Sequence, residues 1–295
     1  MPSNPIGLST FILASPFSSE EAWAFDRVAE LGYDVIEVCI EDPQRITSEW
    51  LVQESQRTGI DVGICGAFGP DRDVSDPDPR RRENGLAYLR GCIDVAAAVG
   101  SPHVAGPMFS ATGRAELLEP GERQARWQNA VESLRAVADY AGDRGVRLAI
   151  EPLNRFETDM VNTVEQGLNL CDDIGRENVG LLVDTFHMNI EEKDIAAAVR
   201  SAGSRIFHVQ VSENDRGTPG SGHVPWASFF DSLKDIDYSG QIVVESFLPT
   251  VKEIARAVSL WRPVAPSMES LSEEGLDFVR RMLDDNRVGG PTWQN

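Results

Sequence analysis

Val146-Arg-Leu-Ala-Ile-Glu151 is the first of four apolar, strand-like runs that each end in a polar residue. The other three are Val179-Gly-Leu-Leu-Val-Asp184, Ile206-Phe-His-Val-Gln210 and Ile242-Val-Val-Glu245. A buried strand that ends in a carboxylate or amide carries this group to the rim of an apolar core, where desolvation is costly unless a cation or hydrogen bonds compensate. Four such endings, separated by helix-like segments, predict one shared metal site.

Strand-like runs alternate with helix-like runs from one end of the chain to the other, which indicates a parallel sheet with crossover helices. Four further strands are predicted before the quoted runs, at residues 6–13, 35–40, 60–67 and 103–106. Helices are expected near residues 18–32, 47–57, 80–99, 121–144, 164–174, 195–202, 226–233 and 251–261. Eight pairs favour a closed (β/α)8 TIM barrel over an open doubly wound sheet, and no GxGxxG follows the first strand to suggest dinucleotide binding.

The length of 295 residues is common for a barrel of this kind. We therefore predict an α/β fold in which residues 1–295 form a single TIM-barrel domain. An extra C-terminal helix, near residues 271–283, is expected to cover one end. Active sites of such barrels lie at the carboxyl ends of the strands, which is where the four polar endings fall.

Composition excludes several classes of protein. The net charge of -20 would repel a phosphate backbone, so nucleic acid is not expected as a partner. No stretch approaches the roughly 20 apolar residues of a membrane span, and the N-terminus lacks the pattern of a signal peptide. The four cysteines are far apart and lack CxxC spacing, so we expect reduced thiols in a soluble, cytoplasmic protein.

Two glutamates, one aspartate and an amide oxygen make a hard, oxygen-rich ligand set. Such a set suits Mn²⁺ or Mg²⁺, with Co²⁺ as a possible substitute. Each carboxylate alone is better explained as a helix cap or an ion-pair partner. The four together, each at a strand end, favour a metal site, and its predicted ligands are Glu151, Asp184, Gln210 and Glu245.

Residues near these endings are candidates for contact with a substrate. Glu157, His187 and Arg216 follow the first three polar endings and could reach substrate hydroxyls. Alternation along the run of residues 206–211 places His208 and Gln210 on one side, facing inward, and Phe207 and Val209 on the other. Further candidates for the pocket are His103, Cys65 and the aromatic residues Phe11 and Phe17, while His223 falls in a glycine-containing loop that suggests a lid.

Four segments together resemble the sugar phosphate isomerase/epimerase superfamily, the xylose isomerase-like TIM barrels. They are Ile150-Glu-Pro-Leu-Asn-Arg-Phe-Glu157, Asp184-Thr-Phe-His187, Ser212-Glu-Asn-Asp-Arg-Gly-Thr-Pro-Gly220 and Val243-Val-Glu-Ser-Phe247. The nearest resemblance is to the D-tagatose and D-allulose (psicose) 3-epimerases. It implies that Glu151 and Glu245 are both metal ligands and the acid/base pair, that Asp184 is a third ligand, and that Glu157, His187 and Arg216 bind substrate.

Gln210 departs from the family pattern, which has a histidine ligand at this position. An amide oxygen can bind Mn²⁺ or Mg²⁺, but it is a weaker donor than imidazole to the later transition metals. We therefore expect the metal to be retained and bound less tightly. His208 is too near the middle of its strand to replace the ligand and is expected to be a buried, hydrogen-bonded histidine.

The residues suit proton transfer next to a carbonyl. A divalent ion stabilises the negative charge of the resulting enediolate, and carboxylates on opposite faces can remove and return the proton. We predict metal-dependent epimerisation of a free ketose at C3 through a cis-enediolate. Because Arg155 and Arg216 are the main cations near the proposed site, no phosphate pocket is expected.

Other functions use the same residues. Return of the proton to the neighbouring carbon gives an aldose–ketose isomerase, and elimination gives the catalytic subunit of a C-glycoside deglycosidase, a 3-oxo-glycoside lyase. A non-enzymatic sugar-binding protein follows if Gln210 abolishes metal binding. Apurinic endonucleases share this barrel but need a histidine-rich metal cluster, and this acidic chain has four histidines. Family resemblance also implies a homodimer or homotetramer.

Overall fold

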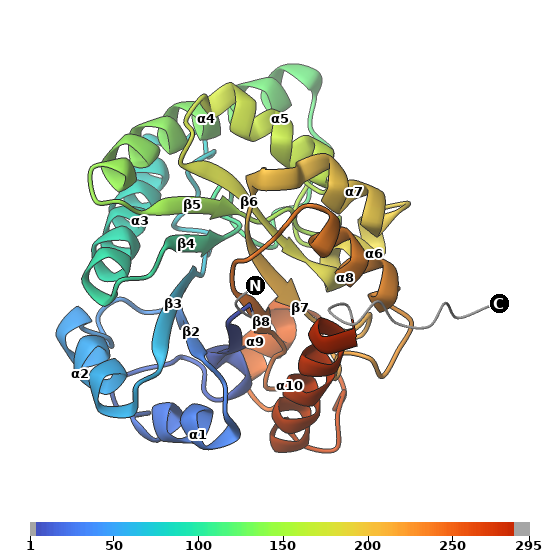
Figure 1. Cartoon of the computed structure of the whole chain (residues 1–295). Helices are drawn as coiled ribbons and strands as arrows, with labels where there is room; N and C mark the ends of the chain where they lie inside the picture. The colour runs from blue at the N-terminus through green and yellow to red at the C-terminus, as the bar shows by residue number, and fades with distance from the viewer. Residues whose placement is uncertain (1–3, 286–295) are drawn as a thin grey trace.

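A computed structural model describes residues 4–285 of the chain. Eight parallel strands close into a barrel in chain order, each hydrogen-bonded to its neighbours and β8 to β1. Figure 1 shows the strands as a central ring with the helices outside it. The strands are β1 (Ile6–Ser9), β2 (Val35–Ile40), β3 (Asp61–Gly66), β4 (His103–Gly106), β5 (Arg147–Ile150), β6 (Val179–Asp184), β7 (Ile206–Val211) and β8 (Ile242–Val244). The predicted TIM barrel is confirmed.

The helices lie close to the positions that the sequence predicts. They are α1 (Trp23–Leu31), α2 (Ser48–Thr58), α3 (Pro79–Val99), α4 (Pro120–Gly142), α5 (Val164–Ile174), α6 (Thr185–Glu191), α7 (Ile195–Ala202), α8 (Trp226–Asp235), α9 (Lys252–Ala257) and α10 (Met268–Asp285), with 3-10 turns η1 (Thr10–Ile12) and η2 (Gly203–Arg205). Helix α1 ends at Gly32, whose φ of 88° is left-handed, a conformation that glycine adopts without strain.

Apolar side chains form two groups on the two faces of the strands. The larger group joins strand residues such as Ile36 and Val38 to helix residues such as Leu51 and Leu89. The smaller group lies inside the barrel and consists of Cys39, Cys65, Ala105, Ala149 and Leu182. These inner side chains are small, and the remaining inward positions carry buried polar groups, including Glu37, His103, His208 and Gln210.

Two outer helices are shorter than predicted. Helix α1 begins at Trp23, about five residues later than expected, and α9 ends at Ala257, about four residues earlier.

Two further differences lie next to strand ends. The chain leaves β1 at Ser9, where a 3-10 turn begins, so this strand is shorter than residues 6–13. Helix α6 follows β6 without a loop and was not predicted; Asp184 caps it by accepting a hydrogen bond from the Phe186 amide at 2.7 Å. Asp184 both ends the strand and caps the helix, so no loop residues separate the two elements. Sequence periodicity therefore gave no signal for the start of the helix.

The strand pairing also corrects one predicted side-chain direction. The β6–β7 register shifts between Leu181 and Leu182, which pair with Ile206 and His208, so that Phe207 has no partner on β6. Phe207 packs against the inner apolar group instead of facing away from it. This is the effect of a bulge, in which one extra residue redirects a side chain.

The extra C-terminal helix is present as α10. It contacts α8, β1 and β8, and in Figure 1 it lies between α1 and α8. Arg27 of α1 forms an ion pair with Glu273 of α10 at 3.2 Å. The helix therefore covers the side of the barrel where β8 meets β1, whereas we had expected it to cover an end.

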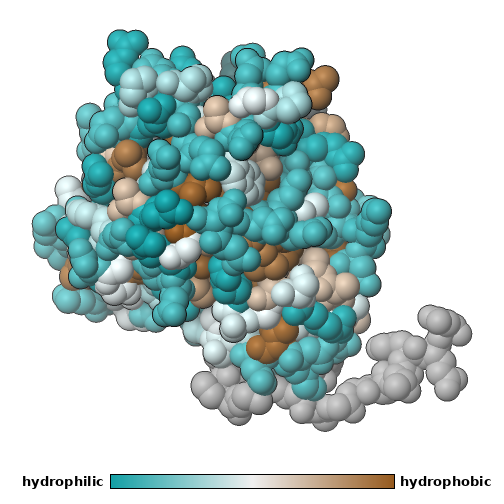
Figure 2. Space-filling model, turned by 90° about the horizontal axis from the view of Figure 1, so that it is seen from above, coloured by the Kyte–Doolittle hydropathy of each residue, from teal (hydrophilic) through white to brown (hydrophobic). Residues whose placement is uncertain are grey.

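The outer surface is mainly polar on the side that Figure 2 shows. Figure 2 shows one side of the molecule as largely hydrophilic, with hydrophobic residues in separate small patches. Among residues 4–285, no helix has the length and apolar character needed to span a membrane.

Candidate active site

A cavity of about 300 Å³ opens at the carboxyl ends of the strands. Its polar floor is formed by Glu151, Glu157, His187, Arg216 and Glu245. Apolar residues form much of its wall, among them Phe11, Phe68, Leu153, Phe247 and Ile254. The backbones of Glu151 and Glu245 extend the strand ladder, because their amides donate to the carbonyls of Gly106 and Val211, each at 3.1 Å. The barrel thus brings both glutamates to one place.

Arg216 lies among the acidic groups of the floor. Its Nη1 donates to Asp184 Oδ2 at 2.6 Å and to Glu245 Oε2 at 3.0 Å, and its Nη2 lies 3.0 Å from His187 Nε2. The guanidinium also stacks on rings, 4.0 Å from the centroid of Phe186 and 5.0 Å from that of Phe247. A buried cation thus compensates the carboxylates that would otherwise be costly to bury.

The backbone at Arg216 is held in an uncommon conformation. Its φ is 67°, in the left-handed region that non-glycine residues rarely adopt. Ser246 donates its hydroxyl to the Arg216 carbonyl at 2.6 Å and so helps to fix this turn. Positions of this kind concentrate at functional sites, because the surrounding structure must outweigh the strain.

Burial and charge shift the pKa values of the acidic groups in different directions. Burial raises the pKa of Glu245 well above its usual value, against the attraction of Arg216, and the neighbouring carboxylates add to the rise. Burial also raises the pKa of Glu151, although its hydrogen bond with His187 opposes the shift. For Asp184 the effect of burial is outweighed by Arg216 and His187, so its pKa is lowered. Asp184 therefore stays ionised to lower pH than either glutamate.

His187 and Glu157 are held by a residue that the sequence analysis missed. The Asn154 backbone amide donates to His187 Nδ1 at 3.0 Å, and the Asn154 side chain donates to Glu157 Oε1 at 2.8 Å. The other ring nitrogen of His187, Nε2, lies 3.4 Å from Glu151 Oε1. The motif of residues 150–157 contains Asn154, but nothing in a single sequence distinguishes it from an ordinary loop asparagine.

Gln210 points across the barrel to a second residue that the sequence analysis missed. Its Nε2 donates to Glu37 Oε1 at 2.7 Å, and both side chains have no exposed area. Because a carboxylate only accepts, the amide nitrogen faces Glu37, and Gln210 Oε1 is left buried without a partner among the described residues. The only local signal for Glu37 was a charge in the middle of an otherwise apolar strand.

The remaining predicted pocket residues divide into two groups. Cys65 and Phe11 line the cavity. His103 instead stacks on His208 inside the barrel, with ring centroids 4.5 Å apart, and Phe17 is fully buried against Trp50. The two ring nitrogens of His208 lack the hydrogen bond that we expected, although Nε2 lies 2.6 Å from Glu37 Oε2.

Two charged or polar residues near the site lie outside the cavity wall. His223 is exposed and does not line the cavity. Arg155 points to Glu191 on the surface, with Nε 2.9 Å from Oε1. Of the arginines and lysines in residues 4–285, only Arg216 lines the cavity.

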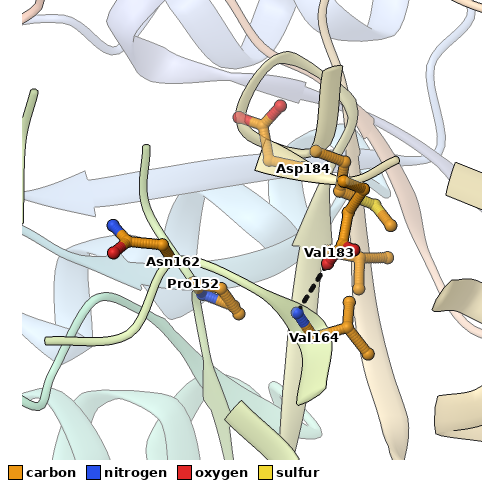
Figure 3. Close-up of a pocket in the computed structure, with 7 residues that line it drawn as sticks. Pro152, Asn162, Val164, Val183 and Asp184 are labelled. Atoms are coloured by element: carbon orange, nitrogen blue, oxygen red, sulfur yellow. Dashed lines mark hydrogen bonds between the residues drawn. The ribbon is translucent and has the colours of Figure 1, made fainter. Parts of the chain in front are cut away.

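A second, much smaller cavity of about 10 Å³ lies behind the acidic floor, with room for about one water molecule. Figure 3 shows Pro152, Asn162, Val164, Val183 and Asp184 around it, with the Asp184 carboxylate directed away from Val164. Val164 donates its amide to Glu192 Oε1 at 2.7 Å. This cavity is a packing feature at the start of α5.

The donor set fits a divalent cation. Ligand atoms of Glu151, Asp184 and His187 all lie within 4.8 Å of one another, and all three residues are buried. Gln210 is the register partner of Asp184, and its Oε1 accepts no hydrogen bond from the described residues. Carboxylate and amide oxygens are the ligands that Mn²⁺ and Mg²⁺ accept. The fold and this buried site define a TIM-barrel enzyme with a candidate metal centre.

Comparisons with known proteins agree with this class. A family model described as xylose isomerase-like TIM barrel matches residues 25–282. The probable ketose 3-epimerase of Synechocystis sp. is 34% identical over 287 residues, which cover 97% of this chain and 99% of the relative. The L-ribulose 3-epimerase of Methylomonas sp. is 35% identical over 259 residues, covering 86% of this chain and 88% of the relative.

A solved structure is similar to nearly the whole chain. The D-allulose 3-epimerase from Methylomonas sp. in complex with D-allulose has a TM-score of 0.89 at 32% identity, covering 95% of this chain and 98% of that chain. This protein therefore belongs to the xylose isomerase-like TIM barrel family. The prediction of an isomerase that resembles ketose 3-epimerases is confirmed.

Proposed function

We propose that this protein is a divalent-metal-dependent epimerase that inverts C3 of a free ketose through a cis-enediolate. The observation that carries the proposal is the pair of buried glutamates, Glu151 and Glu245, on the floor of the cavity in a chain similar throughout to ketose 3-epimerases. They follow β5 and β8, three strands apart in the ring, so they approach a substrate from different sides.

Each glutamate has a proposed role in proton transfer. One carboxylate removes the C3 proton from one face of the sugar, and the other acid delivers a proton to the opposite face, which inverts the centre. In the metal-free protein, burial raises the pKa of both groups toward neutral pH, the direction that favours a general base.

Mn²⁺, with Mg²⁺ or Co²⁺ as alternatives, is the proposed cofactor. Its proposed ligands are Glu151, Asp184, Gln210 and Glu245. When bound, the ion would stabilise the negative charge that develops on the enediolate oxygens. Glu157, His187 and Arg216 would hold the sugar hydroxyls, with Asn154 keeping the first two in place.

A free sugar suits the cavity better than a sugar phosphate. Arg216 is the only arginine or lysine among the described residues that line the cavity, and its guanidinium already contacts two carboxylates. A phosphate dianion would therefore meet net negative charge. The apolar wall excludes water from the reacting carbon, which strengthens the electrostatic interactions of the floor.

Proton NMR in D₂O tests the proposal directly. The Mn²⁺-loaded protein is incubated with D-fructose, D-allulose, D-tagatose and L-ribulose, and new sugar signals are followed together with deuterium at C3. A new epimer labelled at C3 is expected. Exchange at C1 or C2 would assign an aldose–ketose isomerase, and no exchange with any ketose would favour a 3-oxo-glycoside lyase that needs a partner subunit.

Three wider expectations belong to the same proposal. We expect residues 1–295 to fold as a single domain, the protein to be cytoplasmic, and the chain to assemble as a homodimer or homotetramer. Light scattering coupled to size-exclusion chromatography measures the last of these, and a mass equal to the chain mass of 32.4 kDa would contradict it.

A further inference from the structure

A second group of metal-type ligands lies inside the barrel, next to the proposed active site. Cys39 of β2 and Cys65 of β3 are register partners, and Glu37 lies two residues before Cys39 on the same side of its strand. Ligand atoms of these three residues all lie within 4.8 Å of one another. Together they form the thiol cluster, whose residues expose no more than 4% of their area.

The carboxylate of Glu37 in the thiol cluster is fully buried and accepts one hydrogen bond. Among the described residues, the Gln210 amide is the only group that donates a hydrogen bond to Glu37, and it does so to Oε1. Oε2 accepts no hydrogen bond, but it lies 2.6 Å from His208 Nε2, which forms an ion pair with it only if the ring is protonated. A fully buried carboxylate with one unpartnered oxygen is costly unless a cation binds. Oε2 is thus the oxygen that Glu37 could offer to a metal ion.

We propose that Glu37, Cys39 and Cys65 form a second cation site that takes Zn²⁺ or another thiophilic divalent ion. Sulfur ligands select soft and borderline metals, whereas the oxygen-rich active site selects Mn²⁺ or Mg²⁺. On binding, each thiol releases its proton to solvent, and two thiolates and one carboxylate coordinate the ion. Three protein ligands leave the fourth tetrahedral position open for a water molecule or another donor.

The active-site cavity gives an ion access to the thiol cluster. Cys65 lines the cavity together with Glu151 and Glu245, so an ion can reach the sulfur from the sugar side. An occupied thiol cluster would place a second positive charge beside the catalytic carboxylates and take up part of the cavity floor. Zn²⁺ is therefore expected to inhibit the enzyme even when Mn²⁺ is held in excess.

Cadmium provides a direct readout that does not depend on turnover. The Mn²⁺-loaded protein is titrated with Cd²⁺, and the ultraviolet charge-transfer band of the cadmium–thiolate bond is recorded. One Cd²⁺ per chain with this band is expected for the wild type. Cys39→Ser should weaken binding at least tenfold, whereas Cys171→Ser, at a buried cysteine of α5 outside the cluster, should bind as the wild type does.

The absence of a thiolate band in the wild type, or an equal band in Cys39→Ser, would overturn the proposal. If Cys39→Ser does not fold, a second test uses the wild-type protein loaded with Mn²⁺ and one equivalent of Zn²⁺. X-ray absorption at the zinc edge identifies the atoms bound to zinc. Two sulfur atoms at about 2.3 Å from zinc are expected. A zinc shell of oxygen and nitrogen alone would overturn the site. Neither result depends on which sugar the enzyme uses.

Discussion

Buried carboxylates have different partners on the floor of the cavity and in the interior of the barrel just behind it. On the floor, Arg216 contacts Asp184 and Glu245 within 3.0 Å, so the carboxylates are compensated. In the interior, Glu37 receives one amide hydrogen bond, and the neighbouring His103 and His208 have no hydrogen-bonded ring nitrogen. The floor therefore has the charges needed for the proposed enediolate reaction. The interior keeps ligand atoms that this reaction does not use. Gln210 links the two regions.

The largest effect is expected on the floor, from Glu245→Gln. This change removes a proton-transfer group while keeping the side-chain volume, and turnover should fall by about 10²- to 10⁴-fold. Glu132→Gln, at an exposed position of α4, is the matched control and should keep the wild-type rate. Steady-state kinetics with the preferred ketose measures both. A Glu245→Gln rate within twofold of the wild type would remove this residue from the mechanism.

The compensation by Arg216 can be broken directly. Arg216→Met should lower the free energy of unfolding of the metal-free protein by about 3–5 kcal/mol, because it leaves buried carboxylates without a cation. Arg200→Met breaks the half-exposed pair with Asp235 on the outer surface and should cost at most about 1 kcal/mol. Urea denaturation compares the two variants. Equal decreases in the free energy of unfolding would mean that the buried carboxylates of the floor do not depend on Arg216 for compensation.

Metal binding should stabilise the floor through the same carboxylates. At about 100 times its dissociation constant, Mn²⁺ should raise the free energy of unfolding by about 2.7 kcal/mol, since it binds the folded state. Asp184→Asn should lose most of this gain, whereas Asp139→Asn, on the exposed side of α4, should keep it. Thermal melts with Mn²⁺ and with EDTA provide the measurement. A full gain in Asp184→Asn would place the ion elsewhere.

Gln210→His tests the link between the two regions and should have the smallest effect. Imidazole is a stronger donor than an amide oxygen, so the variant should bind Mn²⁺ or Co²⁺ more tightly, by roughly tenfold or about 1.4 kcal/mol. Gln44→His, in an exposed loop, should leave the affinity unchanged. Isothermal titration calorimetry measures both. An affinity unaltered by Gln210→His would assign Gln210 to the interior group alone.

Sequence periodicity predicted the barrel because strands and helices repeat in a strict order with clear boundaries. The strands β4 and β6 and the helices α5 and α7 begin and end at the predicted residues. What periodicity missed depends on contacts across the ring. Glu37 and Gln210 are 173 residues apart and meet only because β2 and β7 lie across the closed barrel.

The acidic residues of the floor were identifiable for a different reason. Each ends a strand, and all strand ends of a parallel barrel meet at one rim, so their proximity follows from topology alone. The position of Arg216 between them does not follow, because it depends on a left-handed turn in the β7–α8 loop. The bulge that redirects Phe207 is likewise a local irregularity, and the alternation of side chains along a strand does not predict it.

Deuterium exchange with the two single-base variants tests the central proposal that Glu151 and Glu245 act on opposite faces of C3. Each epimer of the substrate pair is incubated in D₂O with Glu151→Gln or Glu245→Gln, with the metal content of each variant measured in parallel. Each metal-loaded variant should exchange the C3 hydrogen of one epimer only, a different epimer for each variant, and neither should interconvert them. Exchange of both epimers by one variant, or wild-type epimerisation by either, would contradict the proposed mechanism.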